Sequence, residues 1–185
     1  CTGQDSILDT LPNIGHPVAK VVTATTRPPR VNEEEGAYVW MERHEELDDR
    51  ETVARLVGRY GLIECQKFGE HFYGTPIQSL REAARNSEGR SIIIKNDQYG
   101  APEITERLNG EFDSRTIAIL PETYEQLWSR LVALGRDNPV GRIAEAAVFM
   151  SQFEKVTDYA LVNREYQDTQ KGFECAAHDL SVVLR

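Results

Sequence analysis

Four short runs of apolar residues alternate with longer segments of helical periodicity, and this alternation limits the possible folds more than any other feature. The runs are rich in valine and isoleucine and are mostly uninterrupted by polar residues, which is typical of strands buried on both faces of a parallel sheet. They lie at 17–24, 90–95, 115–120 and 159–163. The helical patterns lie at 76–87, 102–109, 122–134, 139–155 and 168–183. The sequence therefore predicts an α/β core, a parallel sheet flanked by helices with right-handed crossovers.

A region of different character separates the first two apolar runs. Residues 30–89 hold an acidic stretch, the aromatic segment YVWM and a polar helical pattern around 43–58, followed by GLIECQKF and HFYGT. We interpret this region as an inserted β-rich subdomain beside the sheet. Its three consecutive glutamates, at 33–35, are interpreted as a solvated turn rather than a metal site.

The composition narrows the functional classes. The formal net charge of -9 argues against binding to nucleic acid or to acidic membranes, because both need a basic face. No apolar run reaches the roughly 18 to 20 residues of a membrane span, and the N-terminus has no secretory pattern. The 3 cysteines are widely spaced and the 4 histidines are scattered, which predicts reduced thiols and no metal site. We therefore expect a soluble, cytoplasmic protein with one core.

The segment TATTRPPR, residues 23–30, lies at the C-terminal end of the first predicted strand. Ligands of open α/β sheets bind outside such strand ends. Prolines restrict the backbone between Arg27 and Arg30, so the two guanidinium groups are ordered at little entropic cost. A guanidinium fork suits phosphate oxygens. From spacing and placement alone, phosphate binding and ion pairing with neighbouring carboxylates are both open.

Four motifs, in order, resemble the guanylate kinase family. They are TTRPPR with an acidic, glycine-containing turn and a tyrosine strand, then an Ile-Glu pair, then FYGTP, and then an aspartate near a glycine after a buried strand. The resemblance runs from about Gly3 to the end of the chain. It implies a P-loop kinase-like fold in a single domain, with core residues 1–29, 90–128 and 143–185, a GMP-binding subdomain at 30–89 and a short lid at 129–142.

The resemblance also implies an acceptor pocket for GMP. The two arginines would hold the 5′-phosphate together with two tyrosine hydroxyls, and a threonine would contact the base. Glu64 would accept hydrogen bonds from guanine N1–H and the exocyclic amine, donors that adenine lacks on that edge, and an aspartate would add a further acceptor. The implied set is Thr23, Arg27, Arg30, Tyr38, Glu64, Tyr73 and Asp97. Taken singly, the tyrosines also fit a packing role and Glu64 a solvent-facing position in a strand.

The donor side departs from the family pattern. Family members carry the phosphate loop G-x-x-x-x-G-K-[ST], whose lysine reaches the donor phosphates and whose hydroxyl holds magnesium. When Gly3 is aligned with the loop, Gln4 falls at the lysine, Asp5 at the hydroxyl and Ser6 just after it. Glutamine lacks the lysine's charge, and this loss should lower the rate of phosphoryl transfer by roughly 10²- to 10³-fold. The preceding strand and glycine are not in the sequence, and we expect them upstream of Cys1.

A second departure lies after the strand at 90–95. Lys95 stands where the family usually has the first aspartate of Asp-x-Asp. We hypothesise that Lys95 reaches the nucleotide phosphates in place of the lysine missing at Gln4. The alternative is an ion pair with Asp97 or Asp5.

The predicted lid is also altered. Arg130 and Arg142 match two family arginines that embrace the donor phosphates, while Leu134 stands at a third such position. Arg136, two residues further on, is the expected substitute. Asn163, after the last predicted strand, matches a position near the donor base.

Two functions remain open from the sequence. The first is an enzyme that uses ATP and Mg²⁺ to phosphorylate GMP, in which Arg130, Arg136, Arg142 and Lys95 supply the catalytic charge. The second is an impaired module that binds GMP or a phosphorylated ligand and has lost ATP chemistry. Glu64 and Asp97 favour a guanine nucleotide over a peptide. The expected partners are therefore small molecules, GMP and ATP.

Overall fold

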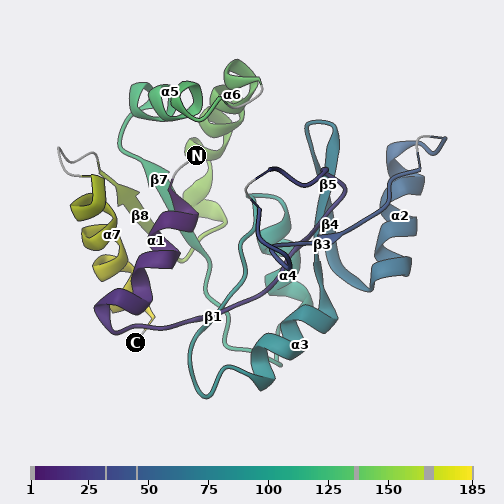
Figure 1. Cartoon of the computed structure of the whole chain (residues 1–185), viewed down its shortest axis with the longest axis horizontal. Helices are drawn as coiled ribbons and strands as arrows, with labels where there is room; N and C mark the ends of the chain where they lie inside the picture. The colour runs from purple at the N-terminus through teal and green to yellow at the C-terminus, as the bar shows by residue number, and fades with distance from the viewer. Residues whose placement is uncertain (1–2, 32, 45, 136–137, 165–168, 185) are drawn as a thin grey trace. The chain divides into compact units, whose positions relative to one another are not determined.

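The computed structural model describes residues 3–31, 33–44, 46–135, 138–164 and 169–184. The chain divides into two compact units (Figure 1). Ala19–Ser114 forms one, the central unit, and Cys1–Val18 with Arg115–Arg185 forms the other, the terminal unit. Each unit has its own strands and helices, and we describe the two in turn.

The central unit contains two small sheets. β1 (Ala19–Lys20) pairs in parallel with β6 (Ile92–Ile93). The second sheet has four strands in the order β3-β2-β5-β4. β2 runs parallel to β3 and antiparallel to β5, and β5 runs antiparallel to β4. These strands are β2 (Ala24–Thr25), β3 (Val39–Trp40), β4 (Leu62–Phe68) and β5 (His71–Pro76).

Three helices complete the central unit. α2 (Asp49–Tyr60) begins at a capping box, in which the Asp48 carboxylate accepts from the Glu51 N–H and the Glu51 carboxylate accepts from the Asp48 N–H. It packs against β4 and shares an apolar core with the four-stranded sheet. α3 (Ile77–Arg85) and α4 (Gly100–Arg107) contribute to a second apolar core, which includes residues next to β1.

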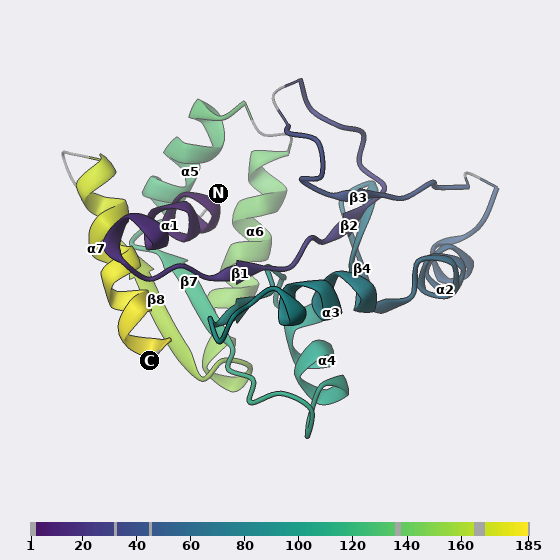
Figure 2. The ribbon, with the colours of Figure 1, turned by 60° about the horizontal axis from the view of Figure 1, so that its bottom comes forward.

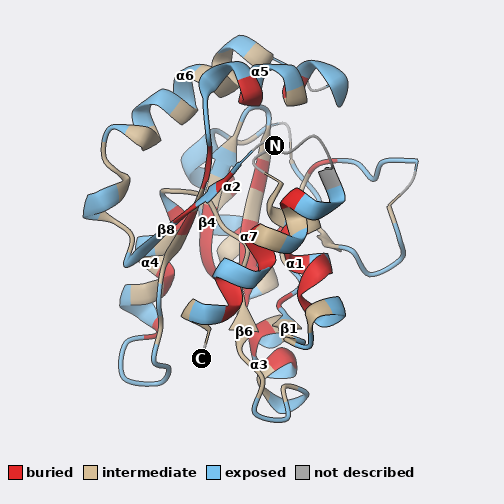
Figure 3. Cartoon of the chain, turned by 90° about the vertical axis from the view of Figure 1, so that its left-hand side faces the viewer, coloured by how far each residue is buried: buried red, intermediate tan, exposed pale blue. Residues whose placement is uncertain are grey.

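The terminal unit is built on two parallel strands, β7 (Ile117–Pro121) and β8 (Tyr159–Asn163). Its helices are α1 (Gln4–Thr10), α5 (Tyr124–Ala133), α6 (Pro139–Met150) and α7 (Thr169–Val183), with 3-10 turns η1 (Leu11–Ile14) and η2 (Phe153–Lys155). α1 packs against α7, and both contribute buried apolar residues (Figures 2 and 3). α5 and α6 form a second helix pair.

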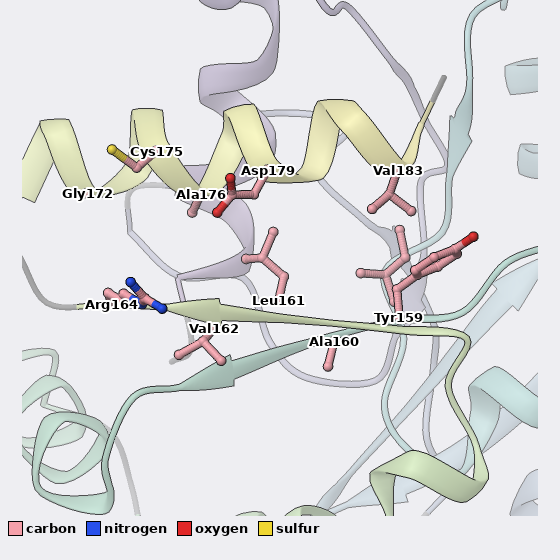
Figure 4. Close-up of a pocket in the computed structure, with 11 residues that line it drawn as sticks. Tyr159, Ala160, Leu161, Val162, Arg164, Gly172, Cys175, Ala176, Asp179 and Val183 are labelled. Carbon is pink, nitrogen blue, oxygen red and sulfur yellow. The ribbon is translucent and has the colours of Figure 1, made fainter.

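The predicted parallel strands are confirmed with two differences. The run 17–24 divides between two sheets: the Val21 N–H still donates to the Ile93 carbonyl (2.9 Å), and the chain then joins β3 and β5. The prediction that each run is buried on both faces is wrong for β8. Leu161 faces α7, whereas Val162 points away from that helix and is 42% exposed (Figure 4).

The predicted helices agree with the structure to within a few residues, except at two ends. The helical pattern around 43–58 becomes a helix only from Asp49 onward. The helix predicted to reach 155 ends at Met150, where the Ser151 hydroxyl donates to the Val148 carbonyl (2.7 Å) and competes with helix continuation. In the described part of the chain, none of the helices is both long enough and apolar enough to cross a membrane.

A pocket of about 430 Å³ lies between β8 and α7 in the terminal unit (Figure 4). Its lining includes Leu161, Arg164, Cys175 and Asp179. The residues that the sequence predicts to bind nucleotide do not line it, so the candidate site has to be sought elsewhere.

Candidate functional site

Threonines anchor the segment TATTRPPR to the four-stranded sheet. Thr25 is fully buried in β2, and its hydroxyl accepts from the Arg27 N–H (3.1 Å). The Thr26 N–H donates to the Phe72 carbonyl and the Thr26 hydroxyl accepts from the Phe72 N–H, both at 2.9 Å. The chain therefore leaves the sheet in a fixed direction, and the two prolines stiffen the loop that follows.

Arg27 is 8% exposed and lies against two aromatic rings. Its guanidinium carbon is 5.4 Å from the centre of the Tyr38 ring and 5.8 Å from that of the Trp40 ring, distances at which cation–π attraction operates. Lys95 Nζ is 6.0 Å from the same Tyr38 ring. Three of the residues predicted to contact phosphate, Arg27, Tyr38 and Lys95, are therefore neighbours.

Glu33 binds the two arginines. Arg27 Nη1 donates to Glu33 Oε2 (3.1 Å) and Arg27 Nη2 donates to Oε1. The Arg30 N–H donates to Oε2 (2.8 Å), and the Arg30 guanidinium lies 3.9 Å from Oε1. The hydrogen bond from Arg27 is the main reason that the pKa of Glu33 is lowered. Burial disfavours the charge on Arg27, but the hydrogen bond to Glu33 and its negative charge outweigh this, and the pKa of Arg27 is raised.

The interpretation of residues 33–35 as a solvated turn is therefore wrong for Glu33, although Glu34 and Glu35 are exposed. Of the two alternatives left open for the arginines, the structure shows ion pairing with a carboxylate. A sequence signal existed for it, because Glu33 follows Arg30 by three residues and Arg27 by six on a stiff loop.

The remaining residues of the predicted acceptor pocket near Arg27 lie on neighbouring strands or in the loop. Tyr73 of β5 is paired with Thr25 of β2, two residues before Arg27, and contributes to the electrostatic environment of Arg27. The Thr23 carbonyl accepts from the Val39 N–H of β3 (2.9 Å). The Arg30 side chain is 50% exposed. The mixed four-stranded sheet thus brings the distant segments 23–30, 38–40 and 71–76 together.

Glu64 is a buried carboxylate. It lies in β4 with 2% of its surface exposed, and its Oε1 accepts from the Thr75 hydroxyl (2.7 Å). Its Oε2 has no hydrogen-bond partner among the described residues. Burial raises the pKa of Glu64 against the lowering effects of the Thr75 hydroxyl and the neighbouring Asn96 amide, and the negative charge of Asp97 raises it further. The solvent-facing alternative for Glu64 is therefore wrong.

Asp97 and its neighbour Asn96 lie in the segment just before α4. Asp97 Oδ1 accepts from the N–H groups of Tyr99 (2.9 Å) and Gly100 (2.8 Å). Asn96 Oδ1 accepts from the Asp97 N–H (2.7 Å), and its buried Nδ2 has no partner within the described residues. A Cβ at Gly100 would lie 2.3 Å from Asn96 Oδ1, so this packing requires glycine. Asn96 is a polar site residue that the sequence prediction missed.

The predicted donor residues belong to the terminal unit. Gly3 has φ +84°, and a Cβ there would lie 2.4 Å from Asn163 Nδ2, so these two residues are in close contact and position 3 requires glycine. Asn163 is 1% exposed, and its carbonyl accepts from Gln126 Nε2 (3.2 Å). Gln4, Asp5 and Ser6 form the first turn of α1, with Asp5 exposed.

The predicted lid residues lie on the paired helices α5 and α6. Arg130 is in α5 and Arg142 is in α6. Arg136, the expected substitute for a third arginine, lies outside the described residues. The described residues contain no group of three or more histidine, cysteine or acidic side chains that could hold a metal ion.

The comparison with protein families decides the relationship. The sequence profile of the family described as Guanylate kinase matches residues 1–178. The chain belongs to the guanylate kinase family. The predicted resemblance, drawn from four motifs, is confirmed.

Individual guanylate kinases agree with this assignment. The guanylate kinase of Alkalilimnicola ehrlichii is 33% identical over 171 residues, which cover 90% of this chain and 78% of that protein. The guanylate kinase of Polaromonas sp. is 30% identical over 185 residues, covering 98% and 81%. The crystal structure of guanylate kinase from Anaplasma phagocytophilum matches with a TM-score of 0.65 at 24% identity, covering 97% of this chain and 81% of that one. The predicted fold class is confirmed.

Proposed function

We propose that this member of the guanylate kinase family transfers the terminal phosphoryl group of ATP to GMP, giving ADP and GDP. Glu64 carries the proposal: it is a buried carboxylate with one oxygen bonded to Thr75 and the other without a partner among the described residues. A buried acceptor is costly unless a ligand satisfies it. Guanine supplies two adjacent N–H donors on one edge, whereas adenine presents an acceptor at the corresponding ring nitrogen.

The arginine cluster supplies the second part of acceptor recognition. Arg27 and Arg30 would bind the phosphate, because guanidinium forks match phosphate oxygens. The Tyr38 and Tyr73 hydroxyls would add hydrogen bonds to the same group. Lys95, whose Nζ lies beside the Tyr38 ring, would add a positive charge at this end of the acceptor.

The acceptor base would lie at Glu64 with help from two flanking positions. Thr23 would contribute its hydroxyl, and Asp97 a further acceptor. We assign this acceptor function to the subdomain 30–89 together with its flanking strands, and the lid function to residues 129–142. The enzyme would act in the cytoplasm on small-molecule substrates.

The terminal unit would bind ATP. Gly3, Gln4, Asp5 and Ser6 would face its phosphates, and Asn163, in contact with Gly3, would help to fix the start of α1. Arg130, Arg142 and Arg136 would stabilise the charge that moves in the transfer. Magnesium, when bound, neutralises the donor phosphates, and Asp5 and Ser6 carry the oxygen ligands that it prefers. Such a transfer depends on positioning and electrostatics, so a nucleophilic side chain is not needed.

The neutral Gln4 is the weak point of the donor site, and Lys95 is its proposed replacement. Positive charge at Lys95 would compensate for the lysine missing from the phosphate loop. A Lys95→Met variant should therefore lose phosphoryl transfer and bind GMP more weakly while its affinity for guanosine is unchanged. Unchanged transfer in Lys95→Met would reject this role.

The test of the function is a phosphotransfer assay with ATP, Mg²⁺ and GMP, in which GDP is separated by chromatography and AMP serves as the alternative acceptor. We expect GDP formation that is lost in Arg27→Ala and retained in Arg85→Ala, a control in the last turn of α3. Saturable GMP binding without GDP would favour the alternative of a binding module that has lost ATP chemistry. Neither binding nor turnover would reject the proposal.

A further inference from the structure

The Arg27 fork already holds an anion, and that anion belongs to the chain itself. The Glu33 carboxylate receives both terminal nitrogens of Arg27 and the N–H of Arg30. The side chains of Glu33 and Arg27 are 17% and 9% exposed, so water covers little of the pair. Of the three consecutive glutamates, Glu34 and Glu35 are exposed. Glu33 is thus a ligand of the arginines rather than a member of a solvated acidic run.

Three of the five N–H donors of Arg27 have acceptors in this arrangement. A guanidinium has five N–H donors, of which Nη1 uses its two on the Pro28 carbonyl (2.8 Å) and on Glu33 (3.1 Å). Nη2 donates to the other oxygen of Glu33. Tyr38 and Trp40 lie against the guanidinium as well. The end-on fork of Nη1 and Nη2 is therefore occupied by Glu33, and a phosphate that binds this fork has to displace the carboxylate, because two anions on one fork repel each other.

We propose that Glu33 is an internal stand-in for the acceptor phosphate and that GMP binds by displacing its carboxylate from Arg27 and Arg30. This inference rests on the proposed role of the two arginines. The ion pair keeps the Arg27 fork ordered before a ligand arrives, which lowers the entropic cost of binding. It also lowers the affinity of every anion for the fork, so that an anion without further contacts binds weakly.

Nucleotides meet this condition in a way that small anions do not. A phosphomonoester offers three acceptor oxygens and a charge of about −1.5 to −2 near neutral pH, more than one carboxylate offers. GMP adds the base contacts proposed at Glu64, which help to compensate for breaking the ion pair. Displacing Glu33 costs inorganic phosphate and GMP the same free energy, and only GMP has base contacts that offset this cost.

Glu33→Gln tests the inference because it keeps the size of the side chain and removes its charge. Calorimetric titration should show GMP binding about tenfold tighter than in the wild type, since charge-assisted hydrogen bonds are roughly twice as strong as neutral ones. Inorganic phosphate should also bind more tightly. Guanosine, which has no phosphate, should bind both proteins equally. Glu34→Gln removes the same charge from an exposed neighbour and should change the Kd for GMP by less than about twofold.

Three results would overturn the inference. The first is weaker GMP binding by a folded Glu33→Gln protein. It would mean that Glu33 positions Arg27 and that the phosphate binds the remaining Nε and Nη2 hydrogens. The proposed function would stand in that case. Equal tightening in Glu34→Gln would reduce the effect to net charge. Absence of GMP binding in both wild type and Glu33→Gln would reject the phosphate site itself. Thermal unfolding verifies folding, and Glu33→Asp, which keeps the charge but shortens its reach, is the second variant.

Discussion

Glu64→Gln should shift the base preference of the acceptor site from guanine towards adenine. Glutamine keeps an oxygen for the Thr75 hydroxyl but places an amide N–H₂ where the unpaired Oε2 of Glu64 now lies. That donor would face the N–H donors of guanine, whereas it would suit the ring acceptor of adenine. A hydrogen bond to a charged group contributes about 1.5 to 3 kcal/mol, so losing one and opposing the second should lower kcat/KM for GMP by roughly 10²-fold or more.

The same substitution should change how stability depends on pH. Burial raises the pKa of Glu64, so the folded protein holds this proton more tightly than the unfolded chain does. The resulting stability is fully present below the unfolded pKa of about 4.3 and is lost as the pH rises through the folded pKa. Glutamine does not titrate, so the Tm of Glu64→Gln relative to wild type should increase with pH across this range.

Two measurements on the same variant separate these effects. Steady-state phosphotransfer with GMP and AMP gives the ratio of kcat/KM values, and thermal unfolding between pH 4 and pH 9, without nucleotide, gives the stability difference. Thr123→Ala, which removes the N-terminal cap of α5 in the terminal unit, is a control that lowers Tm by a similar amount at every pH. An unchanged ratio of GMP to AMP activity in Glu64→Gln would refute the guanine site. A pH-independent difference in Tm would refute the buried, proton-retaining carboxylate.

Two further predictions concern packing and thiol chemistry. Gly3→Ala should lower Tm more than Gly15→Ala. Both glycines have a positive φ, which costs alanine roughly 1 to 2 kcal/mol at either position. Only at Gly3 would the new Cβ also collide with Asn163, since within the described chain nothing lies within 4 Å of a Cβ at Gly15. Burial raises the pKa of Cys65 to about 12, so iodoacetamide at pH 8 should label the partly exposed Cys175 first and leave Cys65 unlabelled until the protein unfolds, as peptide mass spectrometry can show. Labelling of both thiols at equal rates in the folded protein would contradict the burial of Cys65.

The periodicity of the sequence predicted the positions of strands and helices well, but it predicted their burial less well. Apolar runs and helical patterns identify strands and helices because each element must bury one face, and that requirement is local. Whether a strand is covered on its second face depends on other elements. Val162 is exposed for this reason although its run is as apolar as a fully buried strand. The run 17–24 is similarly ambiguous, since its residues satisfy two sheets in succession.

The site residues were predictable to the extent that a motif contains them. Arg27 was identified by its spacing from Arg30 at the end of a predicted strand, and Glu64 by the Ile-Glu motif that resembles guanylate kinases. The compensating groups were harder to find. Glu33 looks like one of three equivalent acidic residues, and only the fold distinguishes it by placing it on the Arg27 fork. Asn96 gives no signal at all, since its buried amide matters only through its position before α4.

The two glutamates of the central unit explain why a nucleotide should bind where simpler ligands do not. Their pKa values are shifted in opposite directions: the hydrogen bond from Arg27 lowers that of Glu33, and burial raises that of Glu64. Glu33 therefore occupies the arginine that a ligand phosphate would need, and Glu64 has an oxygen that could accept a hydrogen bond from a ligand base. A free phosphate would have to break the ion pair between Glu33 and Arg27 without donating to Glu64. A nucleoside would donate to Glu64 without using the arginines. A nucleotide with a guanine base does both, so its affinity should exceed what either part achieves alone.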